Sequence, residues 1–155
     1  MMRTLVLAAI TLLCTGCATS YTDVPVSEPH ATITFQRNKA GVKAVNNEPF
    51  QGYDLLSDPQ CTSFERITGF SFDGQFIKTA RFPAGEKLHF MMHSVPNQNI
   101  YGQWCWSYLG FAPETGRDYV VMHESCTPVV YDKTEGDWQI VRDIDVIDGF
   151  ECPKK

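Results

Sequence analysis

Short runs of alternating apolar and polar residues constrain the fold of this chain more than any other feature. Residues typical of turns separate the runs, and none shows the 3.6-residue period of an amphipathic helix. We expect strands over eight ranges, which are 31–37, 50–56, 75–82, 87–95, 100–111, 118–124, 127–132 and 138–147. This pattern predicts an all-β protein, an antiparallel β-sandwich of about eight strands. The segment 41–49 fits no element.

Composition limits the chain to one globular domain and excludes one class of partner. The hydrophobic fraction of 43% is enough for one core. The length of 155 residues is too short for two ordinary domains. Acidic residues exceed basic ones by 18 to 13, and no basic run interrupts the excess. Nucleic-acid surfaces are built from clustered Lys and Arg, so we expect no nucleic-acid partner.

The first residues have the pattern of an export signal. Arg3 supplies a positive charge, an apolar run follows over 5–13, and small residues lead up to Cys17. A membrane-spanning helix needs about 20 apolar residues, so this run is too short to be an anchor. We expect a signal peptide over 1–16. This signal could lead to modification of Cys17 itself; the alternative is an ordinary secretory signal that has a cysteine near its cleavage site.

Thr15-Gly16-Cys17 resembles the lipobox of bacterial lipoproteins, although Cys14 stands where a Leu is usual. The resemblance implies that Cys17 becomes the lipidated first residue of the mature protein. Loss of the signal removes Arg3, so the acidic excess grows from five charges to six. Ala18 is not the Asp of inner-membrane retention, which implies the periplasmic face of the outer membrane, with surface display left open. Several acyl chains on one cysteine give stable attachment to a membrane.

The segment 17–29 is small, polar and contains proline, with no apolar period. It predicts a flexible tether between the lipidated Cys17 and a β-sandwich domain over 30–155. The twelve residues after Cys17, fully extended, reach about 40 Å at most.

Four cysteines remain after the lipidated one, namely Cys61, Cys105, Cys126 and Cys152. An exported chain with an even number of cysteines usually forms disulfides, and four cysteines allow three pairings. The turn residues at 112–117 predict a hairpin that brings Cys105 near Cys126, which leaves Cys61 to pair with Cys152. Metal-binding thiolates are the alternative, but no two of these cysteines have the spacing of a C-x-x-C motif.

Two segments extend the resemblance beyond the lipobox. The turn Phe82-Pro83-Ala84-Gly85 before a strand, and the run from Cys105 through the 112–117 turn to Val120, are similar to small Ig-like lipoproteins of bacterial envelopes. The resemblance implies an Ig-like β-sandwich of unassigned function; it supports a fold and not a function.

A row of aromatic side chains is the best candidate for a binding site. On a strand, Trp104, Trp106 and Tyr108 share one face, and Cys105 lies on the other. If the second face is core, the row faces outward and suits an envelope protein or a glycan, because Tyr and Trp give large rigid contacts. The alternative is a strand buried on both sides, or one covered by a loop.

Other chemistry is sparse. His89 and His93 would be about 13 Å apart along one strand, too far to share a metal ion. The Asp residues at 143, 145 and 148 resemble a calcium loop whose pattern Ile147 breaks. No catalytic motif occurs. We therefore expect no cofactor, no metal and no enzyme activity. The expected function is a non-catalytic binding or structural module of the envelope; the alternative is an immunity or inhibitor lipoprotein that captures a secreted effector or hydrolase.

Overall fold

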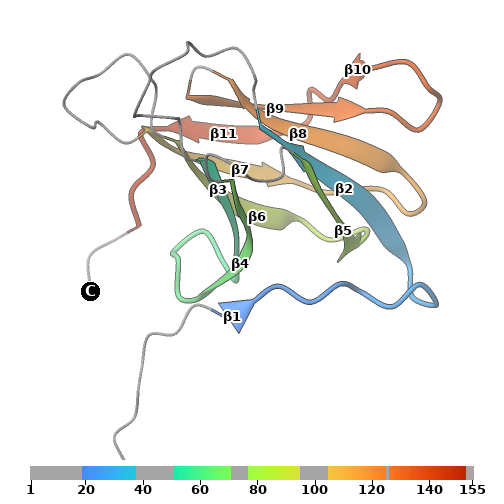
Figure 1. The fold of residues 1–155 in the computed structure, drawn as a ribbon, viewed down its shortest axis with the longest axis horizontal. Coiled ribbons are helices and arrows are strands. Elements are labelled where there is room, and N and C mark those ends of the chain that lie inside the picture. The colour runs from blue at the N-terminus through green and yellow to red at the C-terminus, as the bar shows by residue number, and fades with distance from the viewer. Residues whose placement is uncertain (1–18, 38–50, 71–76, 95–104, 125, 153–155) are drawn as a thin grey trace, which may run out of the picture.

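The chain forms two packed β-sheets (Figure 1). The computed structural model describes residues 19–37, 51–70, 77–94, 105–124 and 126–152. Sheet A holds, in spatial order, β1 (Thr19–Ser20), β4 (Phe64–Phe70), β3 (Gln51–Leu56), β6 (Leu88–Ser94), β7 (Cys105–Phe111) and β11 (Asp145–Asp148). Sheet B holds β10 (Gln139–Ile140), β9 (Thr127–Asp132), β8 (Asp118–Glu124), β2 (His30–Gln36) and β5 (Ile77–Pro83). The predicted all-β sandwich is confirmed.

The pairing differs from the prediction in direction. Most neighbours are antiparallel, but β2 runs parallel to β8 and β1 runs parallel to β4. Both sheets are therefore mixed. The described residues include no helix with the length and hydrophobicity of a membrane span.

Two strand predictions need correction. The predicted strand 138–147 is two short strands, because the chain leaves sheet B after β10 and joins sheet A as β11. Strand β4 was not predicted, because its apolar residues do not alternate. The structure shows the reason, since the register of β4 against β3 shifts between Tyr53 and Asp54. Such a bulge moves the following side chains to the opposite face. The unassigned segment 41–49 lies outside the described residues.

The expected tether is not free along the part that the structure describes. Thr19 and Ser20 pair with β4, and the backbone nitrogen of Tyr21 donates to the carbonyl of Arg66 at 2.9 Å. The Tyr21 ring stacks on Phe82 with centroids 4.4 Å apart. From Thr19 onward the segment therefore packs against the sandwich through these contacts.

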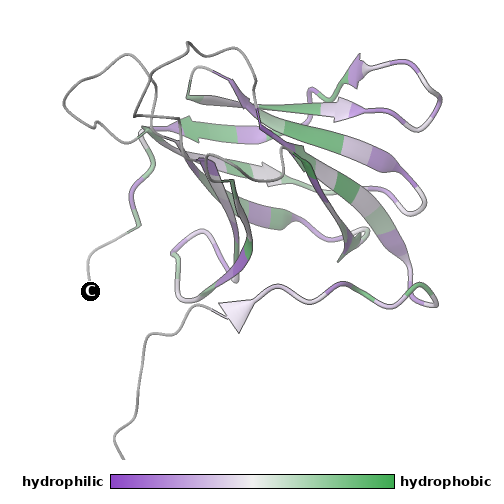
Figure 2. Ribbon diagram, viewed as in Figure 1, coloured by the Kyte–Doolittle hydropathy of each residue, from purple (hydrophilic) through white to green (hydrophobic). Residues whose placement is uncertain are grey.

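The core lies between the sheets and is rich in aromatic rings. Phe35, Phe82 and Phe90 are fully buried at its centre, with centroids 5.6–5.8 Å apart. Successive side chains of a strand point to opposite faces, and along β2 they alternate between hydrophobic and hydrophilic, as Figure 2 shows. The alternation leaves each sheet with an outer face of its own.

Both predicted disulfides are confirmed. Cys61 bonds Cys152 and Cys105 bonds Cys126, with Cα separations of 5.6 and 5.5 Å. In the chain-entropy account their loops stabilise the fold by about 4–5 and about 3 kcal/mol respectively. The second bond joins β7 of sheet A to the segment that follows β8 of sheet B.

Candidate functional site

Strand β7 divides its side chains between the core and the outer face of sheet A, as predicted. Leu109 and Phe111 are buried in the core, while Trp106 and Tyr108 point the other way. The predicted exposed row is nevertheless wrong at Tyr108, which is only 4% exposed. Trp106 is half-buried, and Trp104 lies outside the described residues.

The C-terminal segment covers this face. Phe150 lies 5.2 Å from Tyr108 between ring centroids, and Gly149 donates its backbone N–H to the carbonyl of Trp106 at 2.9 Å. Leu56, Met91 and Tyr108 form a second apolar cluster beneath Cys61, Trp106, Phe150 and Cys152. On this face β7 is therefore a strand covered by a neighbouring segment, one of the two predicted alternatives to an exposed row.

The loop between β3 and β4 completes the cover and is held by its own side chains. Asp58 accepts hydrogen bonds from the backbone nitrogens of Gln60 and Thr62 at 2.8 and 3.3 Å. The hydrogen bonds with Thr62, above all, lower the pKa of this exposed carboxyl. This Asx-type turn positions Pro59 beside the outer face and Cys61 for its bond to Cys152.

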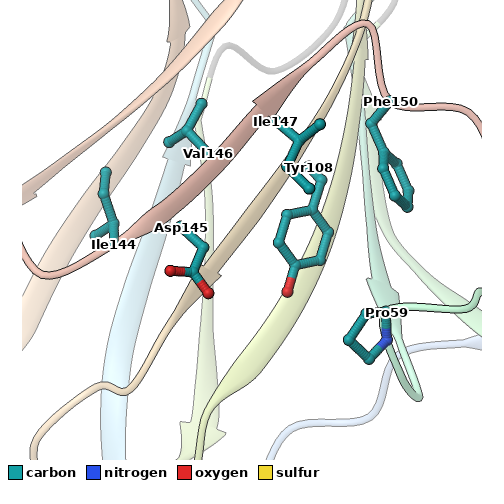
Figure 3. A pocket seen from close by; sticks show the side chains of 7 residues that line it. All are labelled: Pro59, Tyr108, Ile144, Asp145, Val146, Ile147 and Phe150. Carbon is teal, nitrogen blue, oxygen red and sulfur yellow. The ribbon is translucent and has the colours of Figure 1, made fainter.

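An open hollow of about 620 Å³ remains between the cover and β11 (Figure 3). The Tyr108 ring lies between Asp145 on one side and Phe150 with Pro59 on the other. Ile147, on β11, lines the same hollow and is 51% exposed. The lining is completed by Ile144 and Val146. The hollow is thus mainly apolar, with one phenol and one carboxylate at its edge.

Polar groups fix the Tyr108 ring in this position. Its hydroxyl lies 2.6 Å from Nδ1 of His89, and the two rings are nearly parallel. Burial, more than its charged neighbours, raises the pKa of Tyr108. Lys87 forms an ion pair with Asp145 at the exposed rim, and the hydrogen bond to that carboxylate raises the pKa of Lys87. Tyr108 is therefore an uncharged hydrogen-bonding group at neutral pH.

A buried carboxylate lies further along the same face. Asp54 is 1% exposed and accepts a hydrogen bond from Nε of Arg66, so the pair ties β3 to β4. Burial raises the pKa of Asp54, and Arg66 opposes that shift. Removal of one partner would leave a buried charge uncompensated, so this pair serves the fold.

His93 is packed between this pair and Trp106. Its Nδ1 lies 3.9 Å from Oδ2 of Asp54, and its ring centroid lies 4.9 Å from that of Trp106. Burial, together with Arg66 and His123, lowers its pKa to about 4. His93 is therefore neutral at pH 7, and its approach to Asp54 is not an ion pair there. Gly52 leaves room for the ring, since a Cβ at that position would lie 2.1 Å from Cε1 of His93.

The histidines and aspartates considered as metal ligands have other neighbours. His89 contacts Tyr108, His93 packs on Trp106, and Asp145 pairs with Lys87. Among the residues that the structure describes, no three His, Cys, Asp or Glu side chains gather as metal ligands.

Sequence reasoning missed the residues that line the hollow opposite β7. Pro59 and Phe150 lie 91 positions apart and meet because the Cys61–Cys152 bond joins their segments. The predicted pairing of these two cysteines was the signal that could have placed them. Comparisons with protein-family models, curated proteins and solved structures found no match for this chain.

Proposed function

We propose that this chain is a lipid-anchored, non-catalytic binding module of a bacterial envelope, attached through Cys17 to the periplasmic face of the outer membrane. The charged start, apolar run and lipobox-like Thr15-Gly16-Cys17 support export and attachment. The two disulfides are consistent with an oxidising compartment such as the periplasm.

The outer face of sheet A is the proposed binding surface for an envelope protein. The observation that carries this proposal is Ile147, half-exposed on β11 beside the buried Tyr108 ring and the hollow. Large side chains next to a desolvated aromatic pocket are typical of protein interfaces. Trp106 borders this surface, and Trp104, two residues earlier in the sequence, is proposed to extend it.

Strand β11 adds a second means of binding. It is the last strand in the order of sheet A, so its outer edge has no partner strand among the described residues. Exposed acidic side chains outnumber basic ones around this edge: Asp143, Asp145, Asp148 and Glu151 against Arg142 and Lys87, of which Lys87 pairs with Asp145. An extended, basic segment of a partner could pair with this edge by strand addition and place a side chain in the hollow.

This acidic edge also favours the second candidate function. An immunity or inhibitor lipoprotein needs a surface complementary to the effector or hydrolase that it captures, and a basic partner would meet complementary charge here. The two candidates share one binding surface and differ in the partner: a resident protein of the same envelope or a secreted one.

A photo-crosslinking residue at position 147 of the full-length, lipidated protein tests the surface. We expect one discrete partner to be crosslinked in intact envelopes from position 147, and not from position 140 of sheet B, where Ile140 is also exposed. The purified partner should bind the wild-type protein with an affinity that falls as salt rises. Equal crosslinking from both positions would contradict the proposed surface.

Attachment has its own test. Metabolic labelling with a fatty acid should label the wild-type protein, and Cys17→Ser should remove both the label and the membrane association. If Cys17→Ser remains in the membrane fraction with its acyl label, the anchor is misassigned.

A further inference from the structure

The outer face of sheet B carries a second, separate groove of about 430 Å³. One rung of backbone partners crosses this face from Ile140 through Tyr131, Val120 and Thr34 to Thr79. Figure 1 shows β10 beyond β9 at one edge of the sheet, with β5 at the other. The groove lies between the turn before β10 and strands β2 and β5, and it shares no lining residue with the hollow on sheet A.

Trp138 forms one wall of this groove and is 48% exposed. Tyr131 meets its ring edge-on at 5.3 Å, and Nζ of Lys133 lies 5.6 Å from its ring centroid. The Trp138 ring is thus held in place by its neighbours while half of its surface faces solvent. A large aromatic ring held in this way contacts a ligand without a further loss of side-chain entropy.

The turn that carries Trp138 is braced against β8. The backbone nitrogen of Lys133 donates to the carbonyl of Asp118 at 2.8 Å, and that of Asp118 donates to Oγ1 of Thr134 at 2.9 Å. Asp132 accepts from the backbone nitrogen of Thr134 at 2.8 Å and pairs with Arg117. These bonds make the turn a preformed part of the groove.

The remaining wall and floor combine polar and apolar groups. Thr32, Thr34 and Gln36 alternate with the core residues of β2 and therefore present hydroxyl and amide groups outward. Thr34 is hydrogen-bonded to Thr79 at 3.0 Å between hydroxyl oxygens. Val120 and the half-exposed Ile77 supply apolar area beside these groups.

We infer that this groove binds a short, neutral oligosaccharide, with one sugar ring stacked on Trp138. A pyranose has an apolar C–H face that suits an aromatic ring and a rim of hydroxyls that suits Thr, Gln and Asp side chains. Asp118 and Lys133 contribute one charge of each sign, which favours a ligand without net charge. From the β9 side to β5 the groove crosses about three strand spacings, roughly 15 Å, so it is longer than one sugar.

Single-tryptophan fluorescence tests this inference directly. The chain has three tryptophans, so Trp104→Phe with Trp106→Phe leaves Trp138 as the sole reporter. The full-length double variant, in a detergent without a sugar headgroup, is titrated with cello-, chito- and malto-hexaose. We expect a saturable change in emission with one of these, with a Kd of about 10 μM to 1 mM. Calorimetry on the wild-type protein should give the same Kd, which excludes an effect of the two substitutions.

Substitutions distinguish the groove from the rest of the surface. Trp138→Ala should weaken binding at least about tenfold and Trp138→Tyr less, because Tyr keeps an aromatic ring. Thr34→Val should weaken it several-fold through the lost hydroxyl. Ile140→Ala is the matched control, since Ile140 is exposed on the same sheet but does not line the groove. The inference is overturned if no saccharide changes the emission, if Trp138→Ala binds as well as the wild type, or if only peptides bind at Trp138.

This groove stands apart from the proposed anchor and the sheet A surface. The titration uses neither Ile147 nor the edge of β11, so its failure would leave the sheet A proposal intact. A failed crosslink at position 147 would likewise leave the saccharide groove intact.

Discussion

Phe150 lies against Tyr108, with ring centroids 5.2 Å apart, and so closes part of the outer face of sheet A. Two residues later, Cys152 is bonded to Cys61 in the loop after β3. The disulfide and the aromatic contact therefore hold one segment at two points. The shape of the hollow beside Ile147 depends on both.

Loss of the Cys61–Cys152 bond should open this face. In Cys61→Ser with Cys152→Ser, we expect the free energy of unfolding to fall by up to about 4–5 kcal/mol, since the loop of 91 residues is no longer closed in the unfolded chain. Phe150 should also lose its fixed place on Tyr108, because the disulfide is its tie on the C-terminal side, and only the Gly149–Trp106 hydrogen bond then holds the segment next to it among the described residues. Urea denaturation measures the first effect, and carboxypeptidase digestion of the native protein measures the second.

The matched control is Cys105→Ser with Cys126→Ser. This pair closes a loop of only 21 residues, so the expected loss is about 3 kcal/mol, and the C-terminal segment should stay protected from carboxypeptidase. Equal protection of that segment in both variants would contradict the role given to Cys152.

Gly52→Ala should displace His93. The added Cβ would lie 2.1 Å from Cε1 of His93, so the imidazole must move from its place beside Trp106. We expect a loss of about 1–3 kcal/mol in the free energy of unfolding, typical of an overpacked site. Adding His93→Ala should restore part of this loss, and a double-mutant cycle should show coupling above about 0.5 kcal/mol. Additive effects would show that the two residues do not compete for this space.

Acidification should destabilise the protein through His93. Burial lowers its folded pKa to about 4, whereas the unfolded side chain titrates near 6.5. Between these values the unfolded chain binds a proton that the folded protein does not, so stability falls as the pH drops from about 6.5 towards 4. The expected loss is about 1–3 kcal/mol. It should shrink in His93→Phe, as measured by the urea midpoint at pH 7 and pH 4.5.

Asp54 acts in the opposite sense. Burial raises its folded pKa, so on acidification the folded protein takes up a proton before the unfolded chain does. The resulting gain in the free energy of unfolding begins only as the pH falls below this raised pKa. A wild-type curve that stays flat from pH 7 to 4.5, and matches His93→Phe, would contradict the assigned cause.

The sequence predicts best where structure is local. The alternation of β2 places Ile33 and Phe35 in the core, and the turn at 112–117 brings Cys105 to Cys126. It fails where distant segments decide the outcome. Nothing near Tyr108 in the sequence indicates that Phe150 covers it, and a change of sheet divides the last predicted strand. The same limit hid the Trp138 groove, whose opposite wall lies on β2 and β5.

The docked N-terminal segment should keep the domain close to the membrane, if Cys17 is lipidated as proposed. Thr19, only two residues after Cys17, is already paired with Glu65, so the chain between them spans at most about 7 Å. The β1–β4 edge would then lie next to the bilayer, instead of up to about 40 Å away on a free tether.

Tyr21→Ala tests this arrangement, because Tyr21 stacks on Phe82 and donates its hydroxyl hydrogen to the carbonyl of Arg81 at 2.6 Å. We expect residues 19–29 to become sensitive to protease, with a loss of about 1–3 kcal/mol from the burial of one aromatic ring. Energy transfer from a dye at position 64 on β4 to a lipid dye should also weaken as the domain moves outward. Val26→Ala, at an exposed side chain of the same segment, is the control and should change neither measurement. If Tyr21→Ala left the energy transfer and the protease sensitivity unchanged, the docking of this segment would not set the distance between domain and membrane.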